Sequence, residues 1–175
     1  MGTQMRDFVN FLARLEGRNV GIFWLGLGKE KGMDLFDRML ELSNQGFYCA
    51  QILLILALES EGKEDSDLIR AMSGLNGGFG FSGHTCGALS GGCCLLGYFC
   101  GKGEVEEIEE PRMTEMIQAF VEWFHNSVGE TYGGCNCTDI LEGNPMNKMQ
   151  RCPEVVESVF TKCMELLTEY GMIAI

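Results

Sequence analysis

The chain has 175 residues, of which 9 are cysteine and 24 are glycine, and its 13 basic and 25 acidic side chains give a formal charge of −12. A chain of this length buries roughly 70% of its surface on folding, which is enough for one domain whose core needs no disulfides. The hydrophobic content of 46% excludes a disordered protein, and the acidic balance without a Lys/Arg cluster excludes nucleic-acid binding, which relies on a basic patch.

Apolar residues recur at helical spacing along most of the chain, beginning with Phe8, Phe11, Leu12 and Leu15. We assign this first helix to an N-terminal helical extension, residues 1–41, packed on a cysteine-motif domain, residues 42–175, within one compact unit. A helix pair follows at about 33–43 and 49–60, joined by a turn in which Gly46 takes the left-handed conformation. The segment 66–75 is predicted to be helical too.

The middle of the chain differs in composition, because no charged residue occurs from Thr85 to Gly101. This stretch is short and glycine-rich for a membrane span, so the pattern favours a buried central helix without membrane insertion. Gly83, Gly87 and Gly91 recur every four residues, and a helix face of this kind lets a neighbouring helix approach closely.

Two more helices complete the predicted fold. An acidic connector, residues 104–110, precedes a helix that begins behind Pro111 and carries apolar residues up to Phe124, and the last helix runs from Pro153 to a stop at Gly171. Convincing alternating strands are absent from the sequence. The expected fold class is therefore all-α, a single-domain helical bundle with a buried glycine-rich central helix.

A G-x-G-x-x-G pattern at Gly78, Gly80 and Gly83 precedes the central helix. In dinucleotide-binding folds this pattern follows a strand, but the segment before it here is helical in pattern. We therefore do not assign nucleotide binding to this loop.

The cysteines are the main chemical clue. The N-terminus lacks the long apolar region of a secretion signal, so a cytoplasmic location is expected, and thiols there stay free unless they are catalytic, redox-sensing or metal-bound. No C-x-x-C occurs, so any metal site must be assembled by folding rather than by a local motif.

Four of the cysteines fall at or near predicted helix starts: Cys49, Cys86, Cys137 and Cys152. The positive end of the helix dipole and the unpaired N–H groups stabilise a thiolate there, which lowers the thiol pKa and favours nucleophilic or metal-ligating sulfur. Four such positions suggest one converging site. Cys86 is the candidate redox thiol, since a glycine loop precedes it and small residues follow it.

Other residues have less specific signals. Cys135 forms a C-x-C with Cys137, Cys93 could border the site, and His84 lies two residues before Cys86, so these three are candidate substitute or neighbouring ligands. Cys163, on the apolar face of the last helix, is interpreted as core filler, as are Cys93, Cys94 and Cys100 in the main. His125, near a helix end, is interpreted as structural.

Four segments carry a shared pattern: 46–51 (GFYCAQ), 85–91 (TCGALSG), 132–141 and Cys152. Read together, they resemble the C-GCAxxG-C-C family of putative redox-active proteins, bacterial and archaeal proteins named for four cysteines. The resemblance runs from about Leu42 to Leu167, and its cysteines match Cys49, Cys86, Cys137 and Cys152. It implies a small, mainly helical protein with a redox or metal-linked role, often encoded near transporter genes. This chain departs from the pattern in its additional N-terminal segment and in Cys135. Because Cys135 lies two residues before Cys137, either of the two could be the third family cysteine.

Three functions remain in competition. The preferred hypothesis is a cytosolic redox protein whose four motif cysteines hold an iron–sulfur cluster or another thiophilic metal such as zinc, because soft thiolates select these metals. The second is a metal-free thiol–disulfide oxidoreductase. The third is a non-enzymatic accessory or scaffold protein for a membrane transporter. An electron-transfer or transporter partner would follow, and the glycine face could pack internally or across a homo-oligomer.

Overall fold

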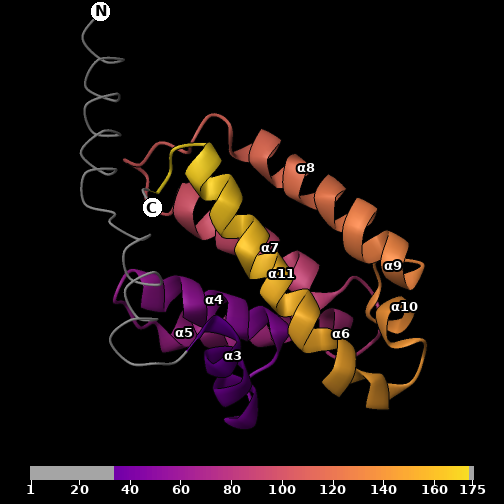
Figure 1. The fold of residues 1–175 in the computed structure, drawn as a ribbon. Helices are drawn as coiled ribbons and strands as arrows, with labels where there is room; N and C mark the ends of the chain where they lie inside the picture. The colour runs from indigo at the N-terminus through magenta and orange to yellow at the C-terminus, as the bar shows by residue number, and fades with distance from the viewer. Residues whose placement is uncertain (1–33, 174–175) are drawn as a thin grey trace, which may run out of the picture.

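The computed structural model describes residues 34–173, and in this range the chain is built from helices (Figure 1). The all-α prediction is confirmed: within these residues the β contribution is an isolated bridge between Thr85 and Asn136. The predicted helix at residues 8–15 and most of the extension 1–41 lie outside the described residues. The elements are α3 (Leu35–Asn44), α4 (Cys49–Ser60), α5 (Ser66–Met72), η1 (Ser73–Leu75), α6 (Asn76–Phe79), α7 (Gly87–Cys100), α8 (Met113–Phe124), η2 (His125–Gly129), α9 (Glu130–Tyr132), α10 (Cys137–Leu141), η3 (Pro145–Asn147) and α11 (Lys148–Glu169).

Helices α3 and α4 form the predicted pair. Asp34 caps α3 by accepting a hydrogen bond from the N–H of Asp37 at 2.8 Å. The turn between the helices contains Gly46 with φ of +95°, a backbone conformation that favours glycine. Helix α4 begins at Cys49, as predicted.

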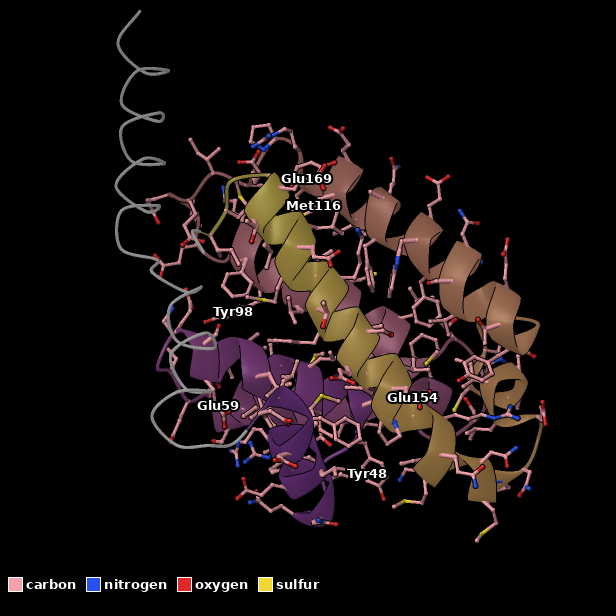
Figure 2. The ribbon with its side chains drawn as sticks, in the orientation of Figure 1. Tyr48, Glu59, Tyr98, Met116, Glu154 and Glu169 are labelled. Atoms are coloured by element: carbon pink, nitrogen blue, oxygen red, sulfur yellow. The ribbon has the colours of Figure 1, made fainter. Side chains whose placement is uncertain are left out.

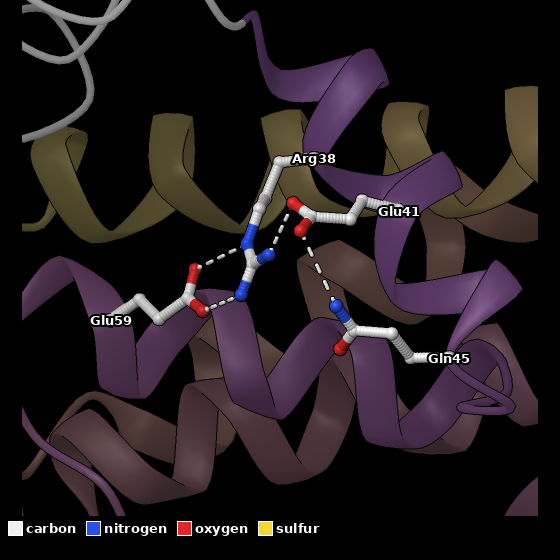
Figure 3. Close-up of polar contacts among 4 residues, drawn as sticks. All are labelled: Arg38, Glu41, Gln45 and Glu59. Carbon is white, nitrogen blue, oxygen red and sulfur yellow. Dashed lines mark hydrogen bonds and ion pairs between the residues drawn. The ribbon is translucent and has the colours of Figure 1, made fainter.

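An ion pair also ties α3 to α4 (Figure 3). The guanidinium of Arg38 forks across both carboxylate oxygens of Glu59, with Nε 3.2 Å from Oε2, and it also pairs with Glu41 on its own helix. These contacts raise the pKa of Arg38, the hydrogen bond to Glu59 contributing most. The fork geometry fixes the angle of α3 against α4.

Helix α7 packs against α4, α8 and α11, with α11 crossing in front of it in Figure 1. Gly91 faces α4 so closely that an added Cβ would lie 2.9 Å from the Cα of Ala50, and Gly92 faces Phe120 of α8 and Val159 of α11. Gly83 is not part of this face, because it lies before the helix with φ of +82°. The loop turns there, so the four-residue glycine spacing predicted a longer helix than forms.

Helix α8 begins at Met113, two residues behind Pro111 and close to the predicted start, but the last long helix begins earlier than predicted. Helix α11 begins at Lys148, so that Pro153 lies inside it rather than at its start. The proline that marks the start of this helical region is Pro145, the first residue of η3, which directly precedes α11.

The acidic connector is exposed except at Glu107, which is half-buried, and at its end. Glu110 is 5% exposed, and its Oε1 accepts a hydrogen bond from Nε of Arg112 at 2.9 Å. The prediction of a wholly solvated connector is therefore wrong at Glu110, since the ion pair allows its burial. Across residues 34–173, no helix has both the length and the apolar composition needed to cross a bilayer.

Candidate functional site

The four cysteines predicted from helix starts all line one cavity of about 130 Å³. They come from four different helices or their first caps: Cys49 of α4, Cys86 before α7, Cys137 of α10 and Cys152 of α11. All nine cysteines of the chain are free thiols. Most of the remaining wall is apolar, with contributions from Met39, Ile52, Ile140, Val155 and Val156.

Cys49 is the first residue of α4, and a buried asparagine holds the start of that helix. The Oδ1 of Asn76 accepts the N–H of Ala50 at 3.2 Å and the thiol of Cys49 at 3.9 Å. Burial raises the pKa of Cys49, while backbone hydrogen bonds from Gly77 and Ala50 lower it. Asn76, 1% exposed, was not singled out from the sequence, since it lies within a segment dominated by glycines.

Cys86 is the N-cap of α7, the helix-start position expected for it. The N–H groups of Ala88 and Leu89 lower its pKa, which is the effect predicted for a helix end. Burial is the larger effect, however, because the residue is 7% exposed, and it raises the pKa of Cys86 to about 12. The expectation of a lowered pKa is therefore wrong for Cys86.

Cys137 begins α10, again at a helix start, and backbone pairing fixes it beside Cys86. The N–H of Cys137 donates to the carbonyl of His84 at 2.7 Å, and the N–H of Cys86 donates to the carbonyl of Cys135 at 2.9 Å. Of the four thiols, that of Cys137 is the least buried. The short bridge between the two loops thus brings residues 51 positions apart in sequence to one cavity.

Cys152 reaches the cavity from within α11, one turn after the helix begins at Lys148. Its position beside Pro153 was read as a helix start, and this interpretation is wrong because the helix begins earlier. No helix-end amide lowers its pKa, and burial raises the pKa of Cys152 to about 12. The negative charges of Cys49 and Cys137 raise it further.

Ionisation of Cys49 affects the other three cavity thiols. A thiolate at Cys49 raises the pKa of Cys86, Cys137 and Cys152, after burial in each case. Ionising one thiol therefore disfavours ionisation of the others. Because burial and this mutual repulsion both raise the pKa of the cavity thiols, the sulfurs are neutral thiols at neutral pH.

One cation opposes this trend. Lys148, the first residue of α11, lines the cavity, and its charge lowers the pKa of Cys49, Cys137 and Cys152. Its Nζ lies 4.1 Å from the ring centre of Tyr48, which Figure 2 labels at the lower end of the bundle near α11. Sequence analysis missed Lys148, because nothing local distinguishes it from a surface lysine.

The positions of the thiols do not form a coordination shell. Among residues 34–173, no three His, Cys, Asp or Glu side chains lie close enough together to hold one metal ion. A mononuclear metal would require the four sulfurs to move closer together. We therefore derive no chemical step through a bound metal or cluster.

The other candidate residues lie outside the cavity. Cys93 belongs to a later turn of α7, and His84 is exposed. Cys94, which follows Cys93, is exposed too, so its interpretation as core filler is wrong. Cys135 contacts His125 instead, with its Sγ 3.2 Å from Nδ1. Cys163 is fully buried in the core, where its thiol faces the carbonyl of Gly92 at 3.7 Å.

Comparison with known proteins supplies the family. No curated protein and no solved structure shows a significant match to this chain. A family model described as "Putative redox-active protein (C_GCAxxG_C_C)" matches residues 47–166, which include all four cavity cysteines and most of the bundle. The match covers more than half of the chain, and the chain therefore belongs to the C_GCAxxG_C_C family of putative redox-active proteins.

Proposed function

We propose that this protein transfers two electrons by reversible disulfide formation in the four-cysteine cavity. The observation that carries the proposal is that four free thiols from four helices line one apolar cavity, in which the charge of a Cys49 thiolate acts on the other three. Dithiol chemistry needs two sulfurs in mutual reach and access for a disulfide partner. It requires neither a coordination shell nor a preformed thiolate on every residue.

Cys137 is the proposed attacking thiol. It is the least buried of the four. Burial raises its pKa and Lys148 opposes the rise, whereas stronger burial raises the pKa of Cys86 and of Cys152 to about 12, so Cys137 forms a thiolate more readily than these two. Its sulfur attacks a partner disulfide R–S–S–R, forms the mixed disulfide Cys137–S–S–R and releases one R–SH. The proton lost by Cys137 goes to that leaving thiol.

Cys49 is the proposed resolving thiol. Its sulfur attacks the mixed disulfide at Cys137, so that Cys49–S–S–Cys137 forms and the second R–SH leaves with the proton from Cys49. The two protein thiols lose two electrons, and the partner disulfide gains them. Backbone N–H groups at Gly77 and Ala50 stabilise the developing charge on Cys49.

The test uses protein purified without oxygen and treated with a small disulfide. The expected result is a peptide pair linking residues 49 and 137, with the loss of these two cavity thiols scored by peptide mapping. Cys49→Ser should stop at the mixed disulfide on Cys137, and Cys137→Ser should prevent it. Cys163→Ser, which changes a core thiol outside the cavity, is the matched control and should react as the parent does.

A thiophilic metal in the same cavity is the second candidate function. It is favoured by the presence of four soft sulfur donors and by the mutual repulsion of their thiolates, which a cation would relieve. Cys49, Cys86, Cys137 and Cys152 would hold it after they move closer together. The measurement is the metal and acid-labile sulfide content of the protein purified without oxygen. About one equivalent of iron with sulfide, or of zinc, would replace the dithiol proposal. If the protein had neither metal nor reactive cavity thiols, the accessory role would be favoured.

A further inference from the structure

Outside the cavity, a cysteine and a histidine form a pair that the proposed redox function does not use. The Sγ of Cys135 lies 3.2 Å from Nδ1 of His125, within hydrogen-bond distance. His125 is exposed and Cys135 is half-buried, so solvent reaches the pair. The ten intervening residues conceal the pair in the sequence, where His125 was interpreted as structural.

The backbone around the pair is unusual. After α8 the chain continues as a π-helix from His125 to Gly129, a rare geometry that is frequent at functional sites. The chain then reverses direction at Gly133, whose φ is +76°, and this reversal brings Cys135 back to the π-helix. The π-helix and the reversal together place the thiol beside the imidazole.

Gly129 provides the space for this contact. A Cβ at Gly129 would lie 2.9 Å from the Sγ of Cys135, so a larger residue there would displace the sulfur. The other side of Cys135 is fixed, because its carbonyl accepts the N–H of Cys86 at 2.9 Å. The thiol is thereby held against the ring by contacts on two sides.

The chemistry of the pair follows from its geometry. A thiol reacts as a nucleophile when a neighbouring base takes its proton, and Nδ1 of His125 lies within hydrogen-bond distance of the Cys135 sulfur. In the tautomer with its proton on Nε2, His125 presents the Nδ1 lone pair to that thiol. A cysteine beside a histidine base is the arrangement that activates sulfur nucleophiles.

We propose that Cys135 and His125 form a second, solvent-facing site that undergoes thiol–disulfide exchange with low-molecular-weight disulfides. His125 takes the proton as Cys135 attacks R–S–S–R, the mixed disulfide Cys135–S–S–R forms, and His125 returns the proton to the leaving R–SH. The S–S bond of the reagent breaks and one new S–S bond forms, so atoms and electrons balance. The site does not depend on disulfide formation in the cavity.

The experiment compares two thiols within one protein. Cys94 is exposed on α7, burial raises its pKa as it does that of Cys135, and among the described residues no hydrogen bond links it to a base. It therefore serves as the comparison thiol without a base. Full-length protein is treated with dithiodipyridine, a neutral disulfide, and peptide mass spectrometry follows each site over time. We expect Cys135 to react at least about tenfold faster than Cys94 at neutral pH, a small share of what general bases contribute in enzymes.

Two variants then separate activation from exposure. His125→Gln keeps a polar side chain but removes the base, and Gly129→Ala keeps both reactive groups but displaces the sulfur; Gly129 has φ of −61°, which alanine adopts freely. Both variants should reduce the Cys135 rate to that of Cys94 while leaving Cys94 unchanged. The proposal would be overturned if Cys135 of the parent protein reacted no faster than Cys94, or if His125→Gln left the rate of Cys135 unchanged. The disulfide between residues 49 and 137 is scored separately, so that failure of one proposal can be told from failure of the other.

Discussion

The sulfur of Cys49 rests directly on Gly87: a Cβ at Gly87 would lie 2.6 Å from Sγ and 2.8 Å from the carbonyl oxygen of Leu75. The glycine after Cys86 thus makes room for the thiol of Cys49 at the contact between α4 and α7. This contact explains how a residue without a side chain can determine the geometry of the cysteine site.

Gly87→Ala should therefore disturb both packing and the site. Overpacking against a backbone carbonyl costs about 1–3 kcal/mol, so the urea midpoint should fall, and formation of the disulfide at Cys49 should slow. Gly97→Ala is the matched control in the same helix, because no described atom lies within 4 Å of its added Cβ. It should be neutral or stabilise the protein by about 0.5–1 kcal/mol. Equal losses in both variants would contradict the assigned contact.

Cys163→Ser should affect stability without affecting the redox chemistry. Cys163 is fully buried and lies outside the cavity, so a hydroxyl in its place loses apolar packing and costs about 1–2 kcal/mol. Denaturant unfolding measures the cost, and disulfide mapping measures the redox activity. If this variant lost the cavity disulfide as Cys49→Ser is expected to do, the separation of core and cavity cysteines would be wrong.

Stability should decrease in alkaline solution because of the cavity thiols. The pKa of Cys86 and that of Cys152 are raised to about 12 in the folded protein, from an ordinary value of 9.0. Since the unfolded chain releases these protons first, the stabilisation is fully present below about pH 9 and is lost as the pH rises toward 12.

Urea midpoints measured at about pH 7, 9 and 10.5 test this expectation. The parent should lose stability over the upper interval, and the double variant Cys86→Ala/Cys152→Ala should lose less, since it lacks the two raised groups. Parallel profiles for the two proteins would assign the alkaline loss to other residues. The comparison within one series removes the contribution of lysine and tyrosine titration.

Lys148→Met should slow oxidation of the cavity. Methionine keeps much of the aliphatic bulk but removes the charge that lowers the pKa of Cys49, Cys137 and Cys152. The rate of disulfide formation at neutral pH should fall by up to about tenfold, the change that one pKa unit produces in the thiolate fraction.

The rate is measured in a Cys135→Ser background, so that exchange at the solvent-facing pair does not contribute. Lys162→Met is the control on the same helix, because Lys162 pairs with Glu165 at 3.2 Å and lies beside Cys163 rather than the cavity. Its rate should match that of the parent. Similar slowing in both lysine variants would point to net charge rather than to Lys148.

Much of the secondary structure follows from local sequence. The apolar spacing located α3, α4, α7 and α8 closely, because a helix that buries one face must repeat its apolar residues at that spacing. Position relative to helix starts also selected Cys49, Cys86 and Cys137, since the residue at a helix end is defined by nearby turns and glycines. The same rule failed in detail at Cys152, where Pro153 was taken for the start of α11.

The sequence by itself determined an all-α chain with cysteines at helix ends, because both depend on neighbouring residues. Only the tertiary structure decided the chemical state of those cysteines. The burial that raises the pKa of Cys86 against its own helix dipole comes from elements distant in sequence, and so does the charge of Lys148. The contact between Cys135 and His125 likewise needs a π-helix and a reversed loop, which no spacing of residues encodes.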